Sequence, residues 1–240
     1  MKVSVCIPMY NENRIIATTA KKLSDYLQKN FDDYEILFCD DGSTDGCGKT
    51  VADLNLPNIR VISFSSNHGK GFAVRKAILE AVGDIRLFLD ADLAYGVDVI
   101  GKIVKAFEEQ PNTDLVLGSR NLQKDGYDGY TFWRKLASKG YLRLLCRVGG
   151  LKISDSQCGC KAFSAKAAKS IFSRCEVDRF AFDFEAILWA NKLEYKVTEI
   201  PVKVLYHGDS KVRVVRDSFR MIKDVHAMRK RIVKAQVERS

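Results

Sequence analysis

Short apolar runs alternate with longer amphipathic stretches through the first half of the chain. The runs are rich in branched and aromatic side chains and too short for typical helices, which indicates buried strands. We expect these strands at Val3–Ile7, Glu35–Cys39, Ile59–Phe64, Ile85–Leu89 and Asp114–Leu117. The stretches between them predict helices near Asn13–Lys29, Gly71–Val82 and Val97–Glu109. Strands that alternate with helices predict the α/β class, with a mostly parallel sheet flanked by helices.

Basic amphipathic helices are expected in the second half of the chain. Phe132–Val148 and Val215–Val233 each carry an apolar stripe at helical spacing, among Lys and Arg side chains. Such a helix either lies in a membrane interface, or packs its stripe on a core and leaves its basic face in water. Two of them in one chain favour the membrane surface. We therefore expect a main domain at 1–210, followed by a basic amphipathic C-terminal helix at 211–240.

The composition is that of a folded, cytosolic protein. Of the 240 residues, 46% are hydrophobic and 29% are charged, which suits one domain with a sizeable core. The seven cysteines are an odd number without a CxxC pair, which favours reduced thiols. The first apolar stretch is too short for a signal peptide, and no run reaches the roughly 18 apolar residues of a transmembrane helix.

The net charge of +9 is concentrated in two segments. Residues 130–152 hold six Lys or Arg and no acid, and residues 211–240 hold ten against three acids, so the remainder of the chain is net −4. A basic patch of this kind calls for an anionic partner, such as nucleic acid, acidic lipid headgroups or a phosphorylated substrate. The negative remainder argues against a module that binds nucleic acid.

Carboxylates follow the expected second and fourth strands. Asp90 and Asp92 come directly behind Ile85–Leu89, and Asp40 and Asp41 follow the second strand. The carboxyl ends of strands are where open α/β sheets bind ligands. Mg²⁺ and Mn²⁺ prefer oxygen ligands, and Mg²⁺ commonly links carboxylates to substrate phosphates. The sequence therefore predicts a divalent metal at Asp90 and Asp92.

Other positions near strand ends suit a nucleotide. Tyr10 and Glu12 follow a turn set by Pro8, where they are placed to stack on a base and to hydrogen-bond with it. A carboxylate after the second strand can bind ribose hydroxyls, but no GxGxxG follows the first strand, which disfavours NAD. The turn into the second expected helix offers Lys70 and, one turn later, Arg75 to an anion, although it lacks Walker A spacing.

In their order along the chain, these motifs resemble family 2 glycosyltransferases with the GT-A fold. The matching elements are Pro8–Glu12, Asp40-Asp41, Gly69–Arg75, Asp90-Ala91-Asp92 and Gly118–Arg120. Later segments are similar to those of polyprenyl-phosphate sugar synthases, which are the dolichyl-phosphate glucose and mannose synthases and their bacterial relatives. These segments are Asp155–Phe163, Phe182–Glu185, Glu199–Val202 and Gly208–Lys211. The resemblance covers roughly residues 3–213.

The resemblance implies a nucleotide-diphosphate sugar donor, a divalent metal and inversion at the anomeric carbon. It places the nucleoside-binding side chains at Pro8, Tyr10, Glu12, Asp40 and Asp41. It assigns the metal and diphosphate to Asp90 and Asp92, with Asp92 and Arg120 expected to act on the leaving group. The side chains near the transferring phosphates are expected to be Arg120, Gln157, Lys161 and Lys211. Many relatives carry Gln where this chain has Ala94, so water or substrate is expected to replace one metal ligand.

The acceptor decides whether the reaction needs a general base. A lipid phosphate is ionised near pH 7 and needs none, whereas a sugar hydroxyl must lose its proton to a carboxylate. Asp183 and Glu185 are the candidate bases, and the alternative role for them is to cap a helix N-terminus. The many cations of the second half favour the phosphate acceptor.

We therefore expect transfer of a hexose to a polyprenyl phosphate at the cytoplasmic face of a membrane, with glucose from UDP-glucose ahead of mannose from GDP-mannose. The nearest alternative is a hydroxyl acceptor in cell-surface polysaccharide or glycolipid synthesis. A sugar-nucleotide pyrophosphorylase is disfavoured, because Met9–Glu12 stands where its Gly-rich loop would follow the first strand. The expected partners are the donor, the lipid phosphate, an anionic membrane surface and, as an option, a membrane-spanning protein, with Mg²⁺ or Mn²⁺ as cofactor and no nucleic acid.

Overall fold

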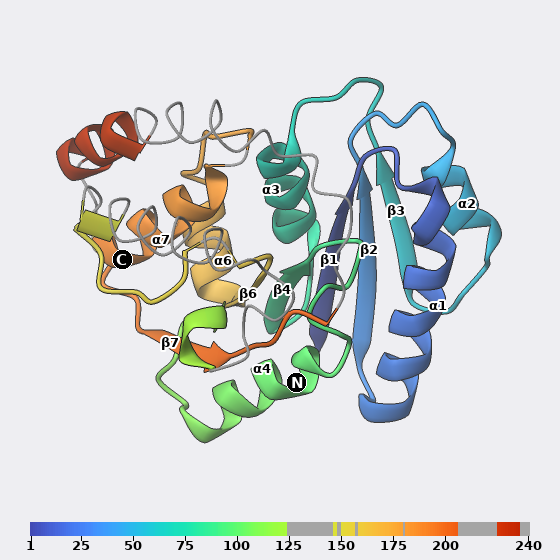
Figure 1. The fold of residues 1–240 in the computed structure, drawn as a ribbon, viewed down its shortest axis with the longest axis horizontal. Coiled ribbons are helices and arrows are strands. Elements are labelled where there is room, and N and C mark those ends of the chain that lie inside the picture. Colours follow the sequence, from blue (N-terminus) through green and yellow to red (C-terminus); the bar gives the residue numbers. More distant parts are fainter. Residues whose placement is uncertain (124–145, 148–149, 157, 180, 206–224, 236–240) are drawn as a thin grey trace.

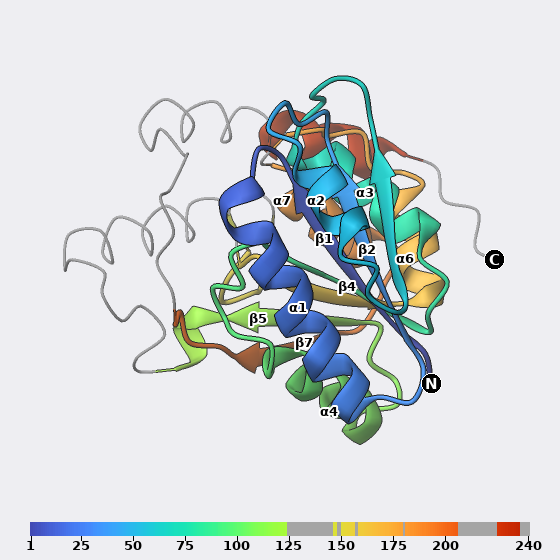
Figure 2. The same ribbon diagram turned by 90° about the vertical axis from the view of Figure 1, so that its right-hand side faces the viewer.

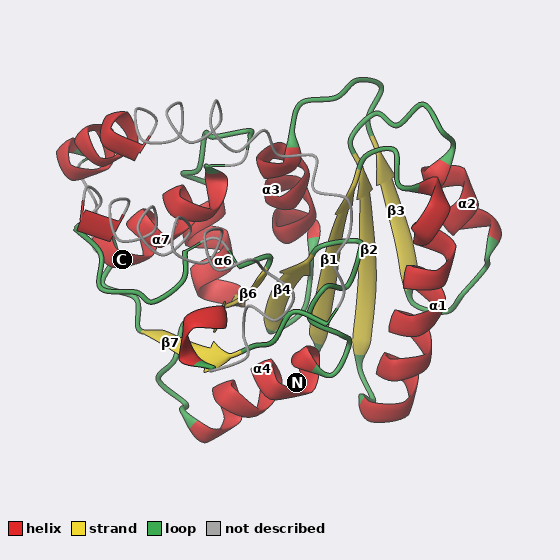
Figure 3. Cartoon of the chain, viewed as in Figure 1, coloured by secondary structure: helices red, strands yellow, loops and turns green. Residues whose placement is uncertain are grey.

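The computed structural model describes residues 1–123, 146–147, 150–156, 158–179, 181–205 and 225–235 (Figure 1). Within them, seven strands form one sheet in the order β3-β2-β1-β4-β6-β5-β7. Figure 3 labels these strands except β5, which is labelled in Figure 2. The strands are β1 (Val3–Met9), β2 (Tyr34–Asp40), β3 (Ile59–Ser63), β4 (Ile85–Leu89), β5 (Leu115–Ser119), β6 (Cys160–Ser164) and β7 (Val197–Pro201). The labelled helices are α1 (Asn13–Asn30), α2 (Cys47–Asp53), α3 (Lys70–Glu80), α4 (Val99–Glu109), the 3-10 turn η1 (Arg120–Leu122), α6 (Ala165–Phe172) and α7 (Phe182–Lys192), and residues 225–234 form a further helix.

The predicted α/β fold with a mostly parallel sheet is confirmed. β1 pairs in parallel with β2 and β4, β2 pairs in parallel with β3, and β5 pairs in parallel with β7. β6 is antiparallel to both of its neighbours, β4 and β5. The hydrophobic pattern does not predict β6, because Lys161 is one of its fully buried residues. The short elements α2, α6 and β7 are not predicted by it either.

Helices cover both faces of the sheet and divide the core into two parts. On one face, α1, α2 and α4 pack through side chains such as Ile16, Leu23 and Ile103 (Figure 2). On the other face, α3, α6 and α7 contribute residues such as Val74 and Ile171. All five of these side chains are fully buried, and each burial contributes about 1.5–3 kcal/mol. The two packed layers hold the strand ends in fixed positions.

The helix at residues 225–234 packs its apolar stripe on the protein body. Val225, Met228 and Ile232 are 0%, 4% and 2% exposed, and they belong to the same core as α3, α6 and α7. Core packing with a basic face in water is thus confirmed for these residues. The favoured interpretation, in which this stripe lies in a membrane interface, is wrong for them, because the stripe is buried against the core. The other basic helix, Phe132–Val148, lies outside the described residues except for 146–147, as does the expected domain boundary at residue 210. In the described parts of the chain, no helix has the length and apolar content needed to cross a membrane.

One edge of the sheet gathers the carboxyl ends of β1, β2, β4 and β5 with the amino end of β6. Because β6 runs in the opposite direction, its first residue Cys160 pairs with Leu89, the last residue of β4. β1 lies between β2 and β4, so the order of strands reverses there. Doubly wound sheets bind ligands at such a switch point, outside the carboxyl ends of the strands. The predicted strand-end motifs therefore meet at this edge.

Candidate active site

Two lysines and two aspartates lie together where β4 ends and β6 begins. Nζ of Lys70, the first residue of α3, lies 2.5 Å from Oδ1 of Asp90. Nζ of Lys161 lies 2.7 Å from Oδ1 of Asp183 and donates to the carbonyl oxygen of Cys158 at 2.5 Å. The side chain of Lys161 has no exposed surface, whereas 34% of the Asp90 side chain is exposed. Asp90 therefore lies at the open side of the cluster.

The pKa shifts show that the two ion pairs act on each other. Burial acts to lower the pKa of Lys70, but the carboxylates of Asp90 and Asp183 raise it above its usual value. Burial raises the pKa of Asp183, against the opposing charges of the lysines. The residue Asp92 is exposed, yet partial withdrawal of its carboxyl group from water and then the charge of Asp90 raise its pKa. A cation bound by both aspartates would relieve this repulsion.

Asp90 and Asp92 have the chemistry of a partial metal site. Their carboxylate oxygens are the ligands that Mg²⁺ and Mn²⁺ prefer. Among the described residues, no group of three or more His, Cys, Asp or Glu side chains is arranged to hold a metal. Ala94 contributes its backbone N–H, which donates to Oδ1 of Asp92 at 3.0 Å. The two aspartates fit a divalent ion whose coordination is completed by substrate and water, and the metal assignment stays a prediction.

Gly159 lets the backbone before β6 approach Asp90 closely. A Cβ atom at this position would lie 2.7 Å from Cγ of Asp90 and closer still to its Oδ2. Glycine, which has no Cβ, is therefore the residue that leaves the Asp90 carboxylate in its place. The sequence motif contains Gly159, but no spacing rule predicts which side chain its backbone faces.

Gly159→Ala is expected to lower kcat/KM by about 10- to 100-fold, because the added methyl group must displace the Asp90 carboxylate and small misplacements have effects of this size. Steady-state kinetics with a nucleotide-sugar donor measure the change. Gly101→Ala is the control for steric strain, since its Cβ atom would lie in α4 at 2.7 Å from the hydroxyl of Tyr26 and touches none of the strand-end aspartates. Wild-type activity of Gly159→Ala would show that Asp90 tolerates displacement.

The carboxylates after β2 hold neighbouring loops. Asp41 accepts hydrogen bonds from the backbone N–H groups of His68, at 3.0 Å, and Gly69, at 2.6 Å. Oδ1 of Asp40 accepts from the backbone N–H of Ser43 at 3.0 Å. Both aspartates are buried. Asp41 therefore anchors the turn before α3, and the roles of both in nucleoside binding stay predictions.

The turn before α3 does not offer these amides to a phosphate. The backbone N–H groups of His68 and Gly69 donate to Asp41. In the first turn of α3, the backbone N–H of Phe72 donates to the carbonyl oxygen of Asp178 at 3.1 Å. Arg75, predicted to face the same ligand as Lys70, instead donates to Oδ1 of Asp178 at 2.6 Å. Lys70 and Arg75 are the two predicted anion contacts, and of these only Lys70 has its side chain beside the strand-end aspartates.

The predicted base-binding residues lie at the end of β1. Pro8 is buried within the strand, which continues to Met9 and so extends two residues beyond the expected end. Tyr10 is 40% exposed, and Glu12 directly precedes α1. The pKa of Asp92 is raised by burial, by the charge of Asp90 and, to a smaller extent, by the charge of Glu12. β1 and β4 are neighbouring parallel strands, so their carboxyl ends lie side by side. Contact with a base stays a prediction.

Arg120, directly after β5, forms a bidentate ion pair. Its Nε and Nη2 atoms donate to the carboxylate of Asp155 at 2.7 and 3.0 Å, a geometry that gives strong pairing. Asp155 is 1% exposed, and Glu199 of β7 accepts from the backbone N–H groups of Ser154 and Asp155. Arg120 thus lies at the predicted edge of the sheet, and its contact with phosphates stays a prediction. No local pattern reveals Asp155 as its partner, because the two are 35 positions apart.

Asp155→Asn is expected to lower the free energy of unfolding near pH 7 by about 2 kcal/mol, the order of a hydrogen bond between charged groups. Burial alone would raise the pKa of Asp155, but the Arg120 guanidinium holds that pKa below its usual value. The wild type therefore has this stabilisation in full above the ordinary carboxyl pKa of about 4, and loses it as the pH falls further. Urea unfolding from neutral to acidic pH should show a steeper loss for the wild type than for the variant. Parallel curves would contradict the ion pair's role.

Glu185, one of the two predicted bases, does not join the aspartate cluster. Its fully buried carboxylate accepts a hydrogen bond from the backbone N–H of Glu176 at 3.0 Å and another from that of Val177 at 2.8 Å. It also pairs with Arg231 of the helix at 225–234. These partners commit Glu185 to the segment before α7.

Asp183 is the predicted base that lies in the cluster. The N-cap residue of α7 is Ala181, and no side chain caps it, so the capping alternative for Asp183 is wrong. Oδ1 of Asp183 accepts from Lys161 instead. Two other predicted residues, Gln157 and Lys211, lie outside the described residues.

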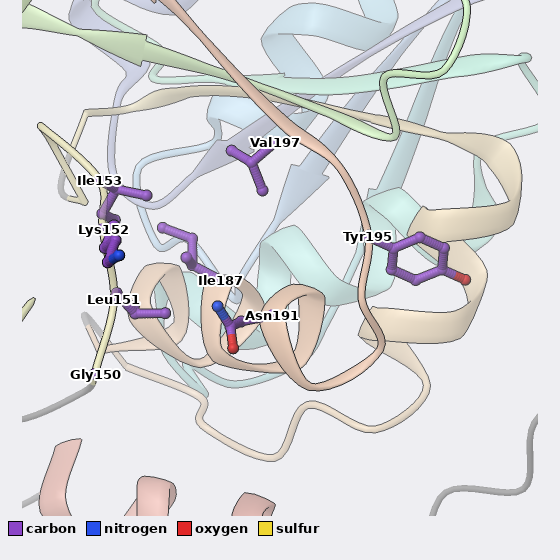
Figure 4. Close-up of a pocket in the computed structure, with 8 residues that line it drawn as sticks. All are labelled: Gly150, Leu151, Lys152, Ile153, Ile187, Asn191, Tyr195 and Val197. Carbon is purple, nitrogen blue, oxygen red and sulfur yellow. The ribbon is translucent and has the colours of Figure 1, made fainter.

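A hollow of about 330 Å³ lies apart from this cluster (Figure 4). Its eight lining residues are Gly150, Leu151, Lys152, Ile153, Ile187, Asn191, Tyr195 and Val197. Val197 is the first residue of β7, whereas Pro201, the last, pairs with the end of β5 at the edge that holds the site. The hollow therefore lies toward the other end of β7 and contains none of the strand-end carboxylates.

The mixed sheet, its switch point and the paired aspartates after β4 are arranged as the resemblance to GT-A glycosyltransferases implies. The sequence profile described as glycosyl transferase family 2 matches residues 4–172. The chain belongs to this family.

Curated relatives align with nearly the whole chain. The dolichyl-phosphate beta-glucosyltransferase of Saccharomyces cerevisiae is 32% identical over 246 residues, covering 95% of this chain and 74% of the yeast protein. The enzyme of the same name from Homo sapiens is 31% identical over 215 residues, covering 84% of this chain and 66% of the human protein. The chain thus spans about two thirds to three quarters of the length of these relatives.

Solved structures share the fold. Glucosyl-3-phosphoglycerate synthase from Mycobacterium tuberculosis, in complex with Mn²⁺, UDP and phosphoglyceric acid, superposes with a TM-score of 0.71 at 18% identity, covering 98% of this chain and 80% of that chain. Mannosyl-3-phosphoglycerate synthase from Rubrobacter xylanophilus gives 0.68 at 18% identity, covering 98% and 74%. At these identities the likeness concerns the fold, and the predicted GT-A fold is confirmed.

Proposed function

We propose that this protein transfers glucose from UDP-glucose to dolichyl phosphate or another polyprenyl phosphate. The observation that carries the proposal is the extent of the similarity to dolichyl-phosphate beta-glucosyltransferases. The family profile ends at residue 172, the last of α6, but the yeast relative aligns over 95% of the chain. The likeness therefore continues into the half of the chain that resembles polyprenyl-phosphate sugar synthases.

The residues at the switch point suit a nucleotide-diphosphate sugar. Tyr10 and Glu12 would contact the base, and Asp40 lies where a ribose hydroxyl could be bound, as in other doubly wound sheets. Asp90 and Asp92 would hold Mg²⁺ or Mn²⁺ together with the donor diphosphate. When bound, the metal supplies positive charge to the leaving diphosphate. A neighbour of the same fold was crystallised with Mn²⁺ and UDP, which supports this donor class.

The arrangement of carboxylates favours an acceptor that is already ionised. A hydroxyl acceptor needs a base within hydrogen-bond reach of its proton. Glu185 is committed to Arg231 and the segment before α7, and Asp183 is paired with the buried Lys161. A lipid phosphate needs no base, because its oxygen can attack the anomeric carbon directly while the bond to UDP breaks and its electrons pass to the diphosphate. The inversion of configuration expected from the resemblance follows from such a displacement.

The exposed face of the helix at 225–234 supports binding to an anionic membrane surface. Arg229, Lys230 and Lys234 are exposed, while the apolar stripe of the helix is buried in the core. Each basic residue near an anionic leaflet contributes about 1 kcal/mol. Attraction of this kind would hold the protein at the membrane by charge, without insertion of this stripe. We place it at the cytoplasmic face, because all seven cysteines are free, as in a reducing compartment.

Labelled donors test the proposal. UDP-glucose and GDP-mannose are each incubated with dolichyl phosphate, undecaprenyl phosphate or diacylglycerol, in the presence of Mg²⁺, Mn²⁺ or EDTA. We expect lipid-linked glucose from UDP-glucose and a lipid phosphate, and its loss with EDTA. Product on diacylglycerol alone would favour the hydroxyl acceptor. The absence of lipid-linked sugar from every donor and metal would overturn the proposal.

A further inference from the structure

Arg231 joins the C-terminal helix to two acidic side chains of the protein body. It pairs with Glu176, which is exposed, and with Glu185, whose side chain is fully buried. Burial raises the pKa of Glu185 to about 7, against the hydrogen bond from Val177 that favours the ionised form. A guanidinium beside a buried carboxylate also favours ionisation. The guanidinium of Arg231 is therefore a direct counter-charge for the ionised form of Glu185.

Glu185 in turn holds the segment 175–179 against the body. Its carboxylate accepts from the backbone N–H groups of Glu176 and Val177, the latter at 2.8 Å. The following residue, Asp178, contacts the amino end of α3 through both backbone and side chain. Its carbonyl oxygen accepts from the N–H of Phe72 at 3.1 Å, and its Oδ1 accepts from Arg75 at 2.6 Å. The segment thus supports the first turns of α3.

The segment and α3 are too close for side chains between them. A Cβ atom on Gly69 would lie 3.1 Å from the carbonyl carbon of Asp178, and one on Gly71 would lie 2.9 Å from the carbonyl oxygen of Arg179. Both glycines flank Lys70, whose Nζ lies 2.5 Å from Asp90. Because the packing leaves no gap and Asp178 bonds to Phe72 and Arg75, a shift of the segment is transmitted to the first turn of α3, which carries Lys70.

We propose that Arg231 is a positioning residue for the donor site. Through Glu176 and Glu185 it fixes the segment 175–179, which seats α3 so that Lys70 stays beside Asp90. The coupling runs through consecutive contacts and needs no change in the rest of the sheet. The helix that exposes its basic face is thereby linked to the strand-end aspartates. The inference rests on the proposed function only for the identity of the donor.

Hydrogen–deuterium exchange tests the link without any substrate. Arg231→Met is expected to speed exchange of amides in 175–179 and also in 67–73, by about five- to tenfold, the lower range of typical couplings. Lys230→Met removes the same charge from the exposed neighbouring position and should change neither region. Arg231→Lys keeps a cation and should restore part of the protection. Faster exchange in 175–179 alone, or in neither region, overturns the proposal.

Donor kinetics give an independent readout. Arg231→Met should raise KM for the nucleotide-sugar by about five- to tenfold with a smaller change in kcat, as expected when binding rather than chemistry is disturbed. A lower kcat at unchanged KM would contradict the proposal. If Arg231→Met does not fold, hydrogen–deuterium exchange is measured on the double variant Arg231→Met/Glu185→Gln, which leaves no unpaired buried charge. Faster exchange in 67–73 supports the link, and wild-type exchange there overturns it. If the wild type transfers no sugar, the proposed function fails, while the exchange data still decide the role of Arg231.

Discussion

Asp92→Ala is expected to lower turnover by about a thousandfold or more and to leave the fold intact. The activity should fall because a divalent ion contributes several kcal/mol of charge stabilisation to a leaving diphosphate, and each 1.4 kcal/mol is a factor of about ten. The fold should survive because Asp92 is exposed, and because partial withdrawal of its carboxyl group from water and then the charge of Asp90 raise its pKa. Removing it relieves repulsion between the aspartates and, among the described residues, breaks no ion pair.

Asp98→Ala is the matched control for this variant. Asp98 is an exposed aspartate at the start of α4, and its side chain makes no capping hydrogen bond. Initial rates with labelled UDP-glucose and Mn²⁺, together with the thermal midpoint, should place Asp98→Ala near the wild type in both. Titration of Mn²⁺ in the presence of UDP should show weaker metal binding for Asp92→Ala. Full activity of Asp92→Ala would remove the metal assignment.

The arrangement of the strand ends could be predicted because it depends on local patterns. Ile85–Leu89 forms β4 with the expected bounds, and the aspartates behind it follow directly in the sequence. The parallel pairing of β1 with β4 then brings Glu12 to the same edge. A short buried strand followed at once by a polar residue leaves little freedom in where that residue lies.

The partners of the charged residues could not be predicted from local patterns. Arg120 pairs with a residue 35 positions away, and Arg75 with one 103 positions away. Such pairs depend on how whole elements pack, which no spacing along one element encodes. The apolar stripe of the C-terminal helix posed a related ambiguity, because burial in lipid and burial in a core select the same side chains. Its packing with α3, α6 and α7 decides the question for residues 225–235.

Lys161→Met is expected to lower the free energy of unfolding by about 3–5 kcal/mol, the usual effect of removing one partner of a buried ion pair. Lys161 has no exposed surface, and its Nζ donates to Asp183 and to the carbonyl oxygen of Cys158. Methionine fills a similar volume but leaves the carboxylate of Asp183 without a counter-charge. Urea unfolding measures the loss, and Lys166→Met, at an exposed position of α6, is the control for a lysine removed nearby.

The double variant Lys161→Met/Asp183→Asn distinguishes the internal ion pair from the contact with the transferring phosphates that the family resemblance implies. If the pair is internal, removing both charges should restore most of the lost stability, because no unpaired buried charge is left. If Lys161 contacts phosphates, the free energy of unfolding of Lys161→Met should stay within about 1 kcal/mol of the wild-type value, as for surface changes. The variant should also bind the donor more weakly, and adding Asp183→Asn should not restore the binding. The structure favours the first outcome: a lysine without exposed surface reaches a phosphate at the open edge only by giving up its 2.7 Å contact with Asp183.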